Sequence, residues 1–496
     1  MTAVREADRT PRRQPGHPPE QAPTGGGPAS TALVRALREA PRRPLAAAAA
    51  VALVSLLAYA TVRHFVGTSM VDMIVYRAEG AAVAHGGDLY ALRVTEWNLP
   101  ATYPPFAAML FVPTTWFGIG FLRIAITAGN IVLLGVLAHL AFRLVGWPRR
   151  EVRPVGVVLV AGLGVWLEPV FTTLRYGQIN LALACLVLWD LTRADHRTDG
   201  PGRRSLLGRL PRGVAIGIAA GIKLTPGLFA VYLLITGRVR AAITAGLTFL
   251  ATVAVGALVL PDATYGFWTK YLYDSTRVGK TEIVDNQSVR GAVARLLHSA
   301  DPGTLATLAG AAVAVAGLAV AAWAHRSARW LPRGEAWGIC CAAVTAVLIS
   351  PISWTHHWVW CVPVLVLLAA EAAHERSRPA AVRRLRWRPI LAATLLAFLS
   401  FGMWVVPHKG DLDLHLSPLH QLPAAVYPLV GAGFLAVAAA RVGARRRAAG
   451  APMLRLPRQR LAPVTRVTRV APVAPVADVP VGDASVVEGP VADAPA

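Results

Sequence analysis

The sequence predicts an all-α polytopic membrane protein, and three observations lead to that prediction. Of the 496 residues, 55% are hydrophobic and the mean hydropathy is +0.48, an apolar share above that of ordinary soluble domains. Apolar stretches of about 17–23 residues, the length that a bilayer crossing requires, recur along most of the chain. The arginines gather in short clusters between these stretches, as topology signals do. We therefore expect spanning helices joined by loops on both membrane faces.

The composition also excludes several classes of protein. A net charge of +23 would suit a nucleic-acid-binding protein, but the arginines are confined to the short clusters, so we expect no nucleic-acid partner. The four cysteines lie inside apolar stretches without the spacing of metal ligands, and we predict no metal site. The sequence contains no Walker-type loop, no strand-linked dinucleotide fingerprint and no HExxH motif, which argues against ATP or nicotinamide chemistry.

Both ends of the chain differ in composition from its apolar middle. Residues 1–44 are rich in proline, glycine and charge, and they end in a basic cluster. This pattern predicts a disordered cytoplasmic arm followed by an uncleaved anchor. Residues 443–496 form a low-complexity segment rich in valine, alanine and proline, which we predict to be a disordered cytoplasmic tail. Between them, 45–442 is predicted to form one transmembrane domain.

The topology of that domain follows if every arginine cluster faces the cytoplasm, because crossings must then come in pairs between clusters. Two apolar stretches do not fit: 106–118 is short, and 214–235 has basic residues at both ends and Lys223 in its middle. We predict that both are re-entrant or broken helices. The other stretches give about ten crossings of the plasma membrane, near 45–65, 121–144, 155–172, 178–194, 239–260, 304–324, 335–350, 357–372, 389–406 and 422–441. The large outer loops are then 67–105, 261–303 and 407–421.

The first outer loop carries the leading catalytic candidate, Asp72. Apolar residues flank this acid on both sides, and burial would raise the pKa of its carboxyl and suit it to act as a general base. The alternative is an ordinary solvated loop acid. The loop closes on Tyr103-Pro104-Pro105-Phe106, whose tandem prolines predict an extended turn at the start of a helix. We expect Tyr76, Tyr103 and Pro104 to form one wall of a cleft beside Asp72.

Cationic and amide side chains follow on the same predicted side. Lys223 stands in an apolar stretch, where an ammonium group is costly unless paired, and a phosphate anion is its natural partner. Charge alone adds Arg77 and Arg290 as phosphate-binding candidates. Four amide side chains either cap helices or line the cleft: Gln178, Asn180, Asn286 and Gln287.

The segment 350–358 adds two adjacent histidines, His356 and His357. At a membrane surface they could bind a metal, bind phosphate or transfer protons. Adjacent residues of a helix point about 100° apart, so we do not expect both to hold one ion. Trp354 either belongs to an interfacial aromatic belt or lines the cleft.

Seven short motifs follow one another in the chain: D-x-x-V-Y-R at 72–77, L-Y at 89–90, L-P-x-T-Y-P-P-F at 99–106, Y-G-Q-I-N at 176–180, K-L-T-P at 223–226, N-Q-S-x-R-G at 286–291 and S-P-I-S-W-x-H-H-W at 350–358. None is specific alone. In this order they resemble glycosyltransferase family 87, the polyprenyl-phosphate-mannose-dependent α-mannosyltransferases of actinobacteria. The resemblance covers the chain from about Asp72 to about Leu368.

The resemblance implies the multi-pass architecture of the GT-C superfamily, with a catalytic aspartate in the first extracytoplasmic loop. Carried over to this chain, it makes Asp72 the general base and places the histidine pair near the donor phosphate. Which of His356 and His357 is functional stays open. The resemblance also implies a polyprenyl-phosphate-mannose co-substrate and a glycolipid or lipoglycan acceptor. Arg, Lys or His can stabilise a phosphate leaving group, so we expect no obligatory cofactor.

The implied reaction is inverting transfer of a hexose, mannose by the resemblance, at the outer membrane face. A transporter or flippase of a lipid-linked sugar would use a similar groove without a base, but we find no internal repeat of the kind that transporters show. An interaction scaffold or sensor subunit would not need Asp72, Lys223 and His356 together. The sequence alone leaves the sugar (arabinose or another hexose included), the acceptor, the linkage and the oligomeric state open.

Overall fold

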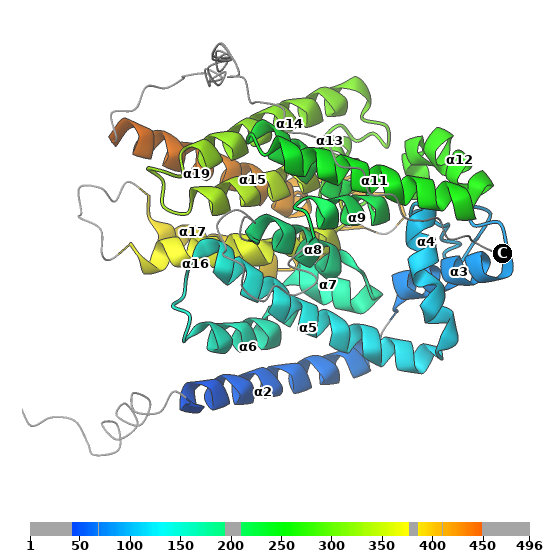
Figure 1. Ribbon diagram of the computed structural model, residues 1–496, viewed down its shortest axis with the longest axis horizontal. Helices are drawn as coiled ribbons and strands as arrows, with labels where there is room; N and C mark the ends of the chain where they lie inside the picture. The colour runs from blue at the N-terminus through cyan, green and yellow to red at the C-terminus, as the bar shows by residue number, and fades with distance from the viewer. Residues whose placement is uncertain (1–41, 68, 194–209, 376–384, 409, 449–496) are drawn as a thin grey trace, which may run out of the picture. The chain divides into compact units, whose positions relative to one another are not determined.

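The computed structural model describes residues 42–67, 69–193, 210–375, 385–408 and 410–448 (Figure 1). Most of the arm predicted over 1–44 and of the tail predicted over 443–496 lies outside these residues. All regular structure in the described residues is helical, apart from two isolated bridges, Val94 with Leu99 and Asn286 with Trp354. The prediction of an all-α membrane protein is therefore confirmed.

The helices follow one another with short connections. In chain order they are α2 (Arg42–Val66), α3 (Val71–His85), α4 (Pro105–Phe111), α5 (Ile119–Val145), α6 (Arg153–Leu163), α7 (Glu168–Tyr176), α8 (Asn180–Thr192), α9 (Val214–Ile222), α10 (Leu228–Ile235), α11 (Val239–Val259), α12 (Pro261–Thr269), α13 (Val289–Leu296), α14 (Gly303–Arg326), α15 (Gly334–Ile349), α16 (Cys361–Ala373), α17 (Trp387–Leu399), α18 (Pro418–Ala424) and α19 (Val426–Ala448).

Six of the described helices are long and apolar enough to cross a membrane: α2, α5, α11, α14, α19 and the helical segment Thr355–Ala373 that includes α16. A seventh span results if α6 and α7, which meet at a bend of 76°, are taken together. The other three predicted crossings coincide with the shorter apolar helices α8, α15 and α17. The chain is thus a multi-pass membrane protein, while a count of about ten crossings stays a prediction.

The core lies around α15, which is buried on nearly all sides, whereas α2, α11 and α14 expose leucine and valine side chains along their lengths. Small residues bring helices close together. A Cβ atom on Gly317 of α14 would collide with Thr345 of α15, and one on Gly162 of α6 would collide with Ala52 of α2. Close backbone approach at such residues is a common way to pack helices in membranes.

The two stretches that did not fit as crossings are indeed interrupted. The segment 214–235 is divided into α9, a 3₁₀ turn at Thr225–Gly227 and α10, and Lys223 at the break has an extended backbone (φ −147°, ψ 127°). The segment 106–118 consists of α4 and a 3₁₀ helix at Val112–Trp116. As the tandem prolines predicted, Pro105 is the first residue of α4 and Pro104 precedes it.

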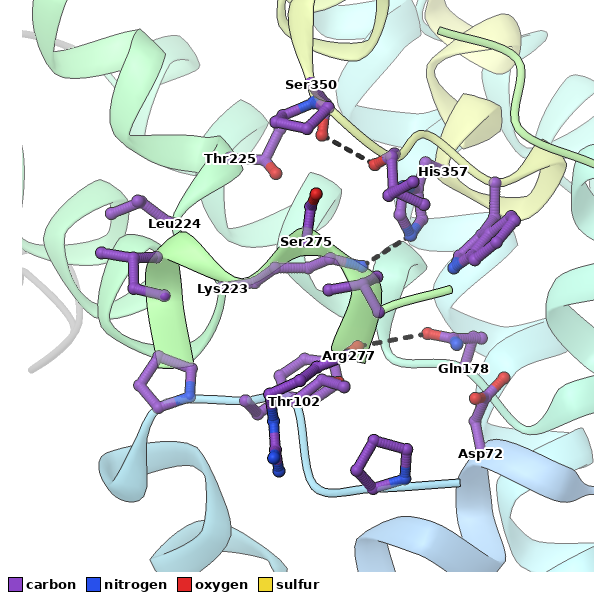
Figure 2. A pocket seen from close by; sticks show the side chains of 18 of the residues that line it. Asp72, Thr102, Gln178, Lys223, Leu224, Thr225, Ser275, Arg277, Ser350 and His357 are labelled. Carbon is purple, nitrogen blue, oxygen red and sulfur yellow. Dashed lines mark hydrogen bonds between the residues drawn. The ribbon is translucent and has the colours of Figure 1, made fainter. Parts of the chain in front are cut away.

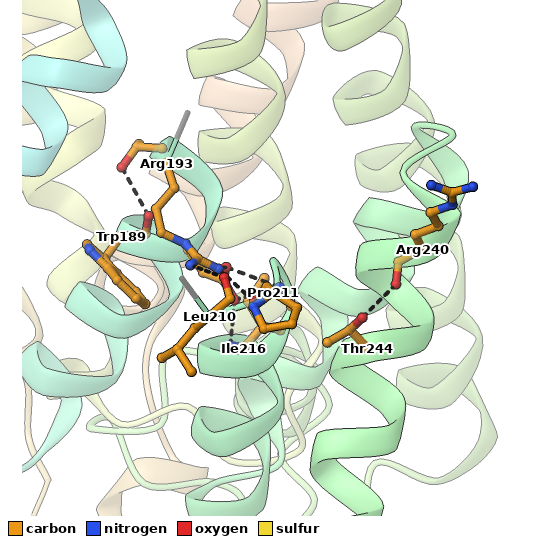
Figure 3. Close-up of polar contacts among 10 residues, drawn as sticks. Trp189, Arg193, Leu210, Pro211, Ile216, Arg240 and Thr244 are labelled. Atoms are coloured by element: carbon orange, nitrogen blue, oxygen red, sulfur yellow. Dashed lines mark hydrogen bonds and ion pairs between the residues drawn. The ribbon is translucent and has the colours of Figure 1, made fainter. Parts of the chain in front are cut away.

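Helix α9 is joined to α8 at the end far from Lys223 (Figure 3). The Asp190 carboxylate near the end of α8 accepts hydrogen bonds from the backbone N–H groups of Gly213 (2.9 Å) and Ile216 (3.1 Å) at the start of α9. It also binds Arg193 at 2.6 Å, and Arg193 in turn donates to the Leu210 and Pro211 carbonyls. A carboxylate at this place satisfies N–H groups that have no partner within the helix.

Candidate active site

A cavity of about 500 Å³ opens between residues 72–104 of the predicted first outer loop (hereafter the first outer segment), the break at Lys223 and the segment 349–357 (Figure 2). Its polar lining is contributed by parts of the chain that are far apart in sequence. The lining includes Asp72, Tyr76, Thr102, Tyr103, Pro104, Gln178, Lys223, Thr225, Ser275, Arg277, Ser350, Trp354 and His357. Leucine, isoleucine and valine side chains complete the wall. A cavity of this size with a few convergent polar groups is the usual form of a substrate site.

Asp72 lies in the first turn of α3, so the first outer segment is not the irregular loop that the sequence suggested. Neighbouring side chains on α3, Met73, Val75 and Tyr76, are buried. Burial raises the pKa of the Asp72 carboxyl to about 6, although a hydrogen bond from Gln178 and the charge of Lys223 act in the opposite direction. A carboxyl of this kind is poised to accept a proton near neutral pH.

The Y-G-Q-I-N motif explains how Gln178 comes to lie beside Asp72. Gly177 ends α7 with φ +72°, and a Cβ atom here would lie 2.8 Å from the Met73 side chain. The Met70 N–H binds the Arg175 carbonyl at 3.0 Å and so joins the start of α3 to the end of α7. Only glycine adopts this conformation readily and leaves room for the approach of the two helices.

Two tyrosines and Gln178 form a connected group on the wall next to Asp72. The Tyr76 hydroxyl donates to Gln178 Oε1 at 2.8 Å and lies 2.9 Å from the Tyr103 hydroxyl. The Tyr103 hydroxyl lies 3.4 Å from the same oxygen. Because this oxygen is occupied by the tyrosines, the Gln178 amide nitrogen is directed to Asp72. The predicted wall residues Tyr76, Tyr103 and Pro104 therefore do line one cavity with Asp72.

Lys223 contributes a positive charge to the same cavity. Its ammonium lies 2.8 Å from His357 Nε2 and 3.1 Å from Asn180 Oδ1, and 5.5 Å from the centre of the Tyr103 ring. Both polar partners are neutral, and no carboxylate within the described part of the chain lies at ion-pair distance. The charge is therefore available to an anion in the cavity.

The structure distinguishes the two histidines. Their rings are nearly perpendicular (86°) in the 3₁₀ helix Thr355–Trp360. His357 lines the cavity, whereas His356 is only 3% exposed and its carbonyl accepts a hydrogen bond from Asn180 at 3.0 Å. Asp285 binds the backbone N–H of Thr355 at 3.0 Å and so fixes the start of this helix. The geometry thus favours His357 as the residue that meets substrate.

Six predicted site residues do not line the cavity: His356 and Asn180, described above, and four others. Arg290 on α13 lies 3.5 Å from the exposed Asp301, and Arg77 on α3 lies outside the lining. Asn286 and Gln287 are fully buried and bind backbone: Asn286 Oδ1 accepts from the Ser353 N–H at 2.9 Å, and Gln287 Nε2 donates to the Ala424 carbonyl at 2.7 Å. Asn286 therefore holds the segment that carries Trp354 and the histidines, whereas the Gln287 amide joins this loop to the start of α19, where it accepts from the Tyr427 N–H.

Sequence reasoning missed two charged groups near the cavity. Arg277, in the predicted outer loop 261–303, lines it, but an arginine in a loop gives no sign of this. Glu79 lies two turns after Asp72 on α3, is fully buried, and forms no side-chain hydrogen bond among the described residues. Burial raises the pKa of Glu79 to about 8. Its spacing of seven residues from Asp72, which places both on one helix face, could have indicated it.

No group of three or more His, Cys, Asp or Glu side chains that could hold a metal ion occurs in the ranges that the structure describes. The polar groups of the cavity are instead one carboxyl, an ammonium, a guanidinium, one imidazole and several hydroxyls and amides. In such a set the carboxylate can remove a proton, and the cationic groups can receive a developing negative charge.

The chain is similar to several known proteins. The sequence model of glycosyltransferase family 87 matches residues 101–351. The polyprenol-phosphate-mannose-dependent alpha-(1-2)-phosphatidylinositol pentamannoside mannosyltransferase of Mycobacterium tuberculosis (strain CDC 1551 / Oshkosh) is 33% identical over 68% of this chain and 76% of its own length. The polyprenol-phosphate-mannose-dependent alpha-(1-2)-phosphatidylinositol mannoside mannosyltransferase of Mycolicibacterium smegmatis is 32% identical over 62% and 71%.

Among solved structures, ArnT from Cupriavidus metallidurans bound to undecaprenyl phosphate aligns over 80% of this chain and 78% of its own. The sequence identity is 16% and the TM-score is 0.34.

Proposed function

The chain belongs to glycosyltransferase family 87, and from that premise we propose that it transfers mannose from a polyprenyl-phosphate donor to a phosphatidylinositol mannoside or similar glycolipid. The named activities of the mycobacterial relatives support both substrates. They are transferases, and nothing in them favours the transporter alternative. The observation that carries the proposal is that Asp72 and the Lys223–His357 pair line one cavity.

The proposed reaction assigns one step to Asp72 and one to the Lys223–His357 pair. An acceptor hydroxyl attacks the anomeric carbon of the donor sugar, and its proton passes to the Asp72 carboxylate. The bond between that carbon and the phosphate oxygen breaks, and the electron pair leaves with the polyprenyl phosphate. Lys223 and His357 would hold the phosphate as its charge develops. Attack opposite the leaving phosphate inverts the configuration of the anomeric carbon.

The proposed orientation places the cavity outside the plasma membrane and both termini in the cytoplasm, with 45–442 as the catalytic membrane domain. The arginine clusters support this orientation, because basic residues favour the cytoplasmic side. The Arg42 end of α2 and the Ala448 end of α19, both basic, lie opposite α3, α4 and α12 (Figure 1).

The purified full-length chain in lipid nanodiscs tests the proposal directly. It should convert labelled polyprenyl-phosphate mannose and a phosphatidylinositol mannoside into a product one hexose heavier, detected by mass spectrometry. Asp72→Asn should lower the rate at least about 100-fold, while Asp262→Asn, which changes an exposed acid on α12, should not. Absence of product with every acceptor offered, or full activity of Asp72→Asn, would refute it.

A further inference from the structure

Arg277 occupies a part of the cavity that the proposed mechanism does not use. It ends a short 3₁₀ helix, Ser275–Arg277, between α12 and α13, and its side chain lines the cavity (Figure 2). One terminal nitrogen donates to the Tyr90 carbonyl at 2.9 Å and to the Ala101 carbonyl at 3.3 Å. The guanidinium carbon lies 4.4 Å from the centre of the Tyr271 ring. The group is thus held against the wall formed by the first outer segment.

The charge of this guanidinium is not neutralised by the part of the protein that the structure describes. No carboxylate there lies within ion-pair distance of it, and its Nε is buried without a hydrogen-bond partner. Asp274, three residues earlier, binds Thr276 and attracts Arg277 only from beyond ion-pair distance. A partly buried cation that bonds only to carbonyls is unfavourable unless an anion compensates it, and the free edge of a guanidinium suits phosphate oxygens.

The Arg277 position is separate from the Lys223 position. Lys223 is held by Asn180 and His357, whereas Arg277 is held by Tyr90, Ala101 and Tyr271, and the two cations share no hydrogen-bond partner. The cavity therefore offers cationic groups at two places. On the proposed function, two phosphates reach this cavity: the phosphodiester of the donor, and that of a phosphatidylinositol-based acceptor.

On the basis of the proposed function, we propose that Arg277 binds a phosphate oxygen of a lipid substrate at a second anion position of the cavity. A purely structural function is the alternative, since its two carbonyl bonds also connect the second outer loop to the first. The two functions differ in what substitution does. Loss of anion binding acts on phosphate-bearing substrates alone, whereas loss of a structural connection acts on every substrate.

The test compares initial rates of the full-length wild type, Arg277→Gln and Arg277→Lys. The KM of the donor is measured with a saturating alkyl α-mannoside, an acceptor that lacks phosphate. The KM values of two acceptors, the alkyl mannoside and a phosphatidylinositol mannoside, are then measured in turn. Arg277→Gln should raise the KM of one phosphate-bearing substrate about 10-fold, with Arg277→Lys intermediate and the KM of the alkyl mannoside unchanged. The substrate whose KM rises identifies the source of the phosphate.

Arg93→Gln is the matched control, because the exposed Arg93 also reaches the Tyr90 carbonyl (3.4 Å) but does not line the cavity. An equal rise in KM for all three substrates, or no rise for either phosphate-bearing one, would overturn the proposal. Equilibrium binding of polyprenyl phosphate and of phosphatidylinositol gives a second readout without turnover. Arg277→Gln should weaken the binding of one of these two lipids about 10-fold. If it weakens the binding of neither, the proposal for Arg277 fails, whether or not the wild type forms product. Absence of product from the wild type would instead refute the proposed function.

Discussion

The pH dependence of turnover is the most direct consequence of the environment of Asp72. A general base must be ionised before it can accept a proton, so the rate follows the ionised fraction of its carboxyl. With the pKa raised to about 6, that fraction is about one tenth at pH 5, one half at pH 6 and nine tenths at pH 7. An aspartate with an ordinary pKa would already be more than about 90% ionised at pH 5. The structure thus predicts a rise of about 10-fold in kcat/KM from pH 5 to pH 7.

The quantity to measure is kcat/KM, because it reports the groups of the free enzyme, which the structure represents. Initial rates should be taken between pH 4.5 and 8 in nanodiscs with the same lipid. The donor is a phosphodiester and stays ionised throughout this range, so its titration does not interfere. Asp262→Asn should follow the wild-type curve, since this exposed carboxylate lies outside the cavity. A kcat/KM that varies less than about twofold across the range would refute Asp72 as a base with a raised pKa.

Three further outcomes are expected. Lys223→Met should weaken binding of polyprenyl phosphate, which a binding titration measures. It should also move the midpoint of the kcat/KM pH profile upward, because the Lys223 charge lowers the pKa of Asp72. The raised pKa of Glu79 favours the folded state fully below about pH 4.5, and this contribution is lost as pH rises through about 8. The melting temperature of Glu79→Gln should therefore fall less than that of the wild type between pH 5 and 8.5. Equal falls in the two proteins would contradict this prediction. Asp190→Ala leaves the Gly213 and Ile216 N–H groups and Arg193 without their partner. It should lower the free energy of unfolding by at least about 1–2 kcal/mol, which a lower melting temperature would show. An unchanged melting temperature would contradict the importance of this contact.

The interruption of 214–235 could be predicted from sequence because it depends on one charged residue within an apolar segment. A lysine in an apolar helix is unfavourable wherever the chain folds, and the helix does end at Lys223. The helix α3 was missed for the converse reason. Its sequence mixes charged and apolar residues, and the burial of Met73 and Tyr76 depends on contacts with segments more than 25 residues away, such as Gly177 and Tyr103.

Side-chain function was harder to predict than chain path. Charge alone selected Arg290 and passed over Arg277, although both lie in the same outer loop. What separates them is tertiary: Arg290 points to the exposed Asp301, while Arg277 is held against the first outer segment, more than 170 residues away in sequence. The two histidines are a similar case. Adjacent residues necessarily point in different directions, but only the packing of the 3₁₀ helix shows that His357 is the one that faces the cavity.

The position of Lys223 follows from the ends of two antiparallel helices. At one end of the pair Asp190 on α8 binds the first N–H groups of α9; at the other, Asn180, the first residue of α8, binds Lys223, which directly follows α9. The negative end of the α9 dipole stabilises a cation here, and the break exposes the ammonium to the cavity instead of to lipid. A lysine that looks misplaced along the sequence therefore lies at the end of a helix, where the dipole offsets part of the cost of burying its charge. That leaves its charge available for a phosphate.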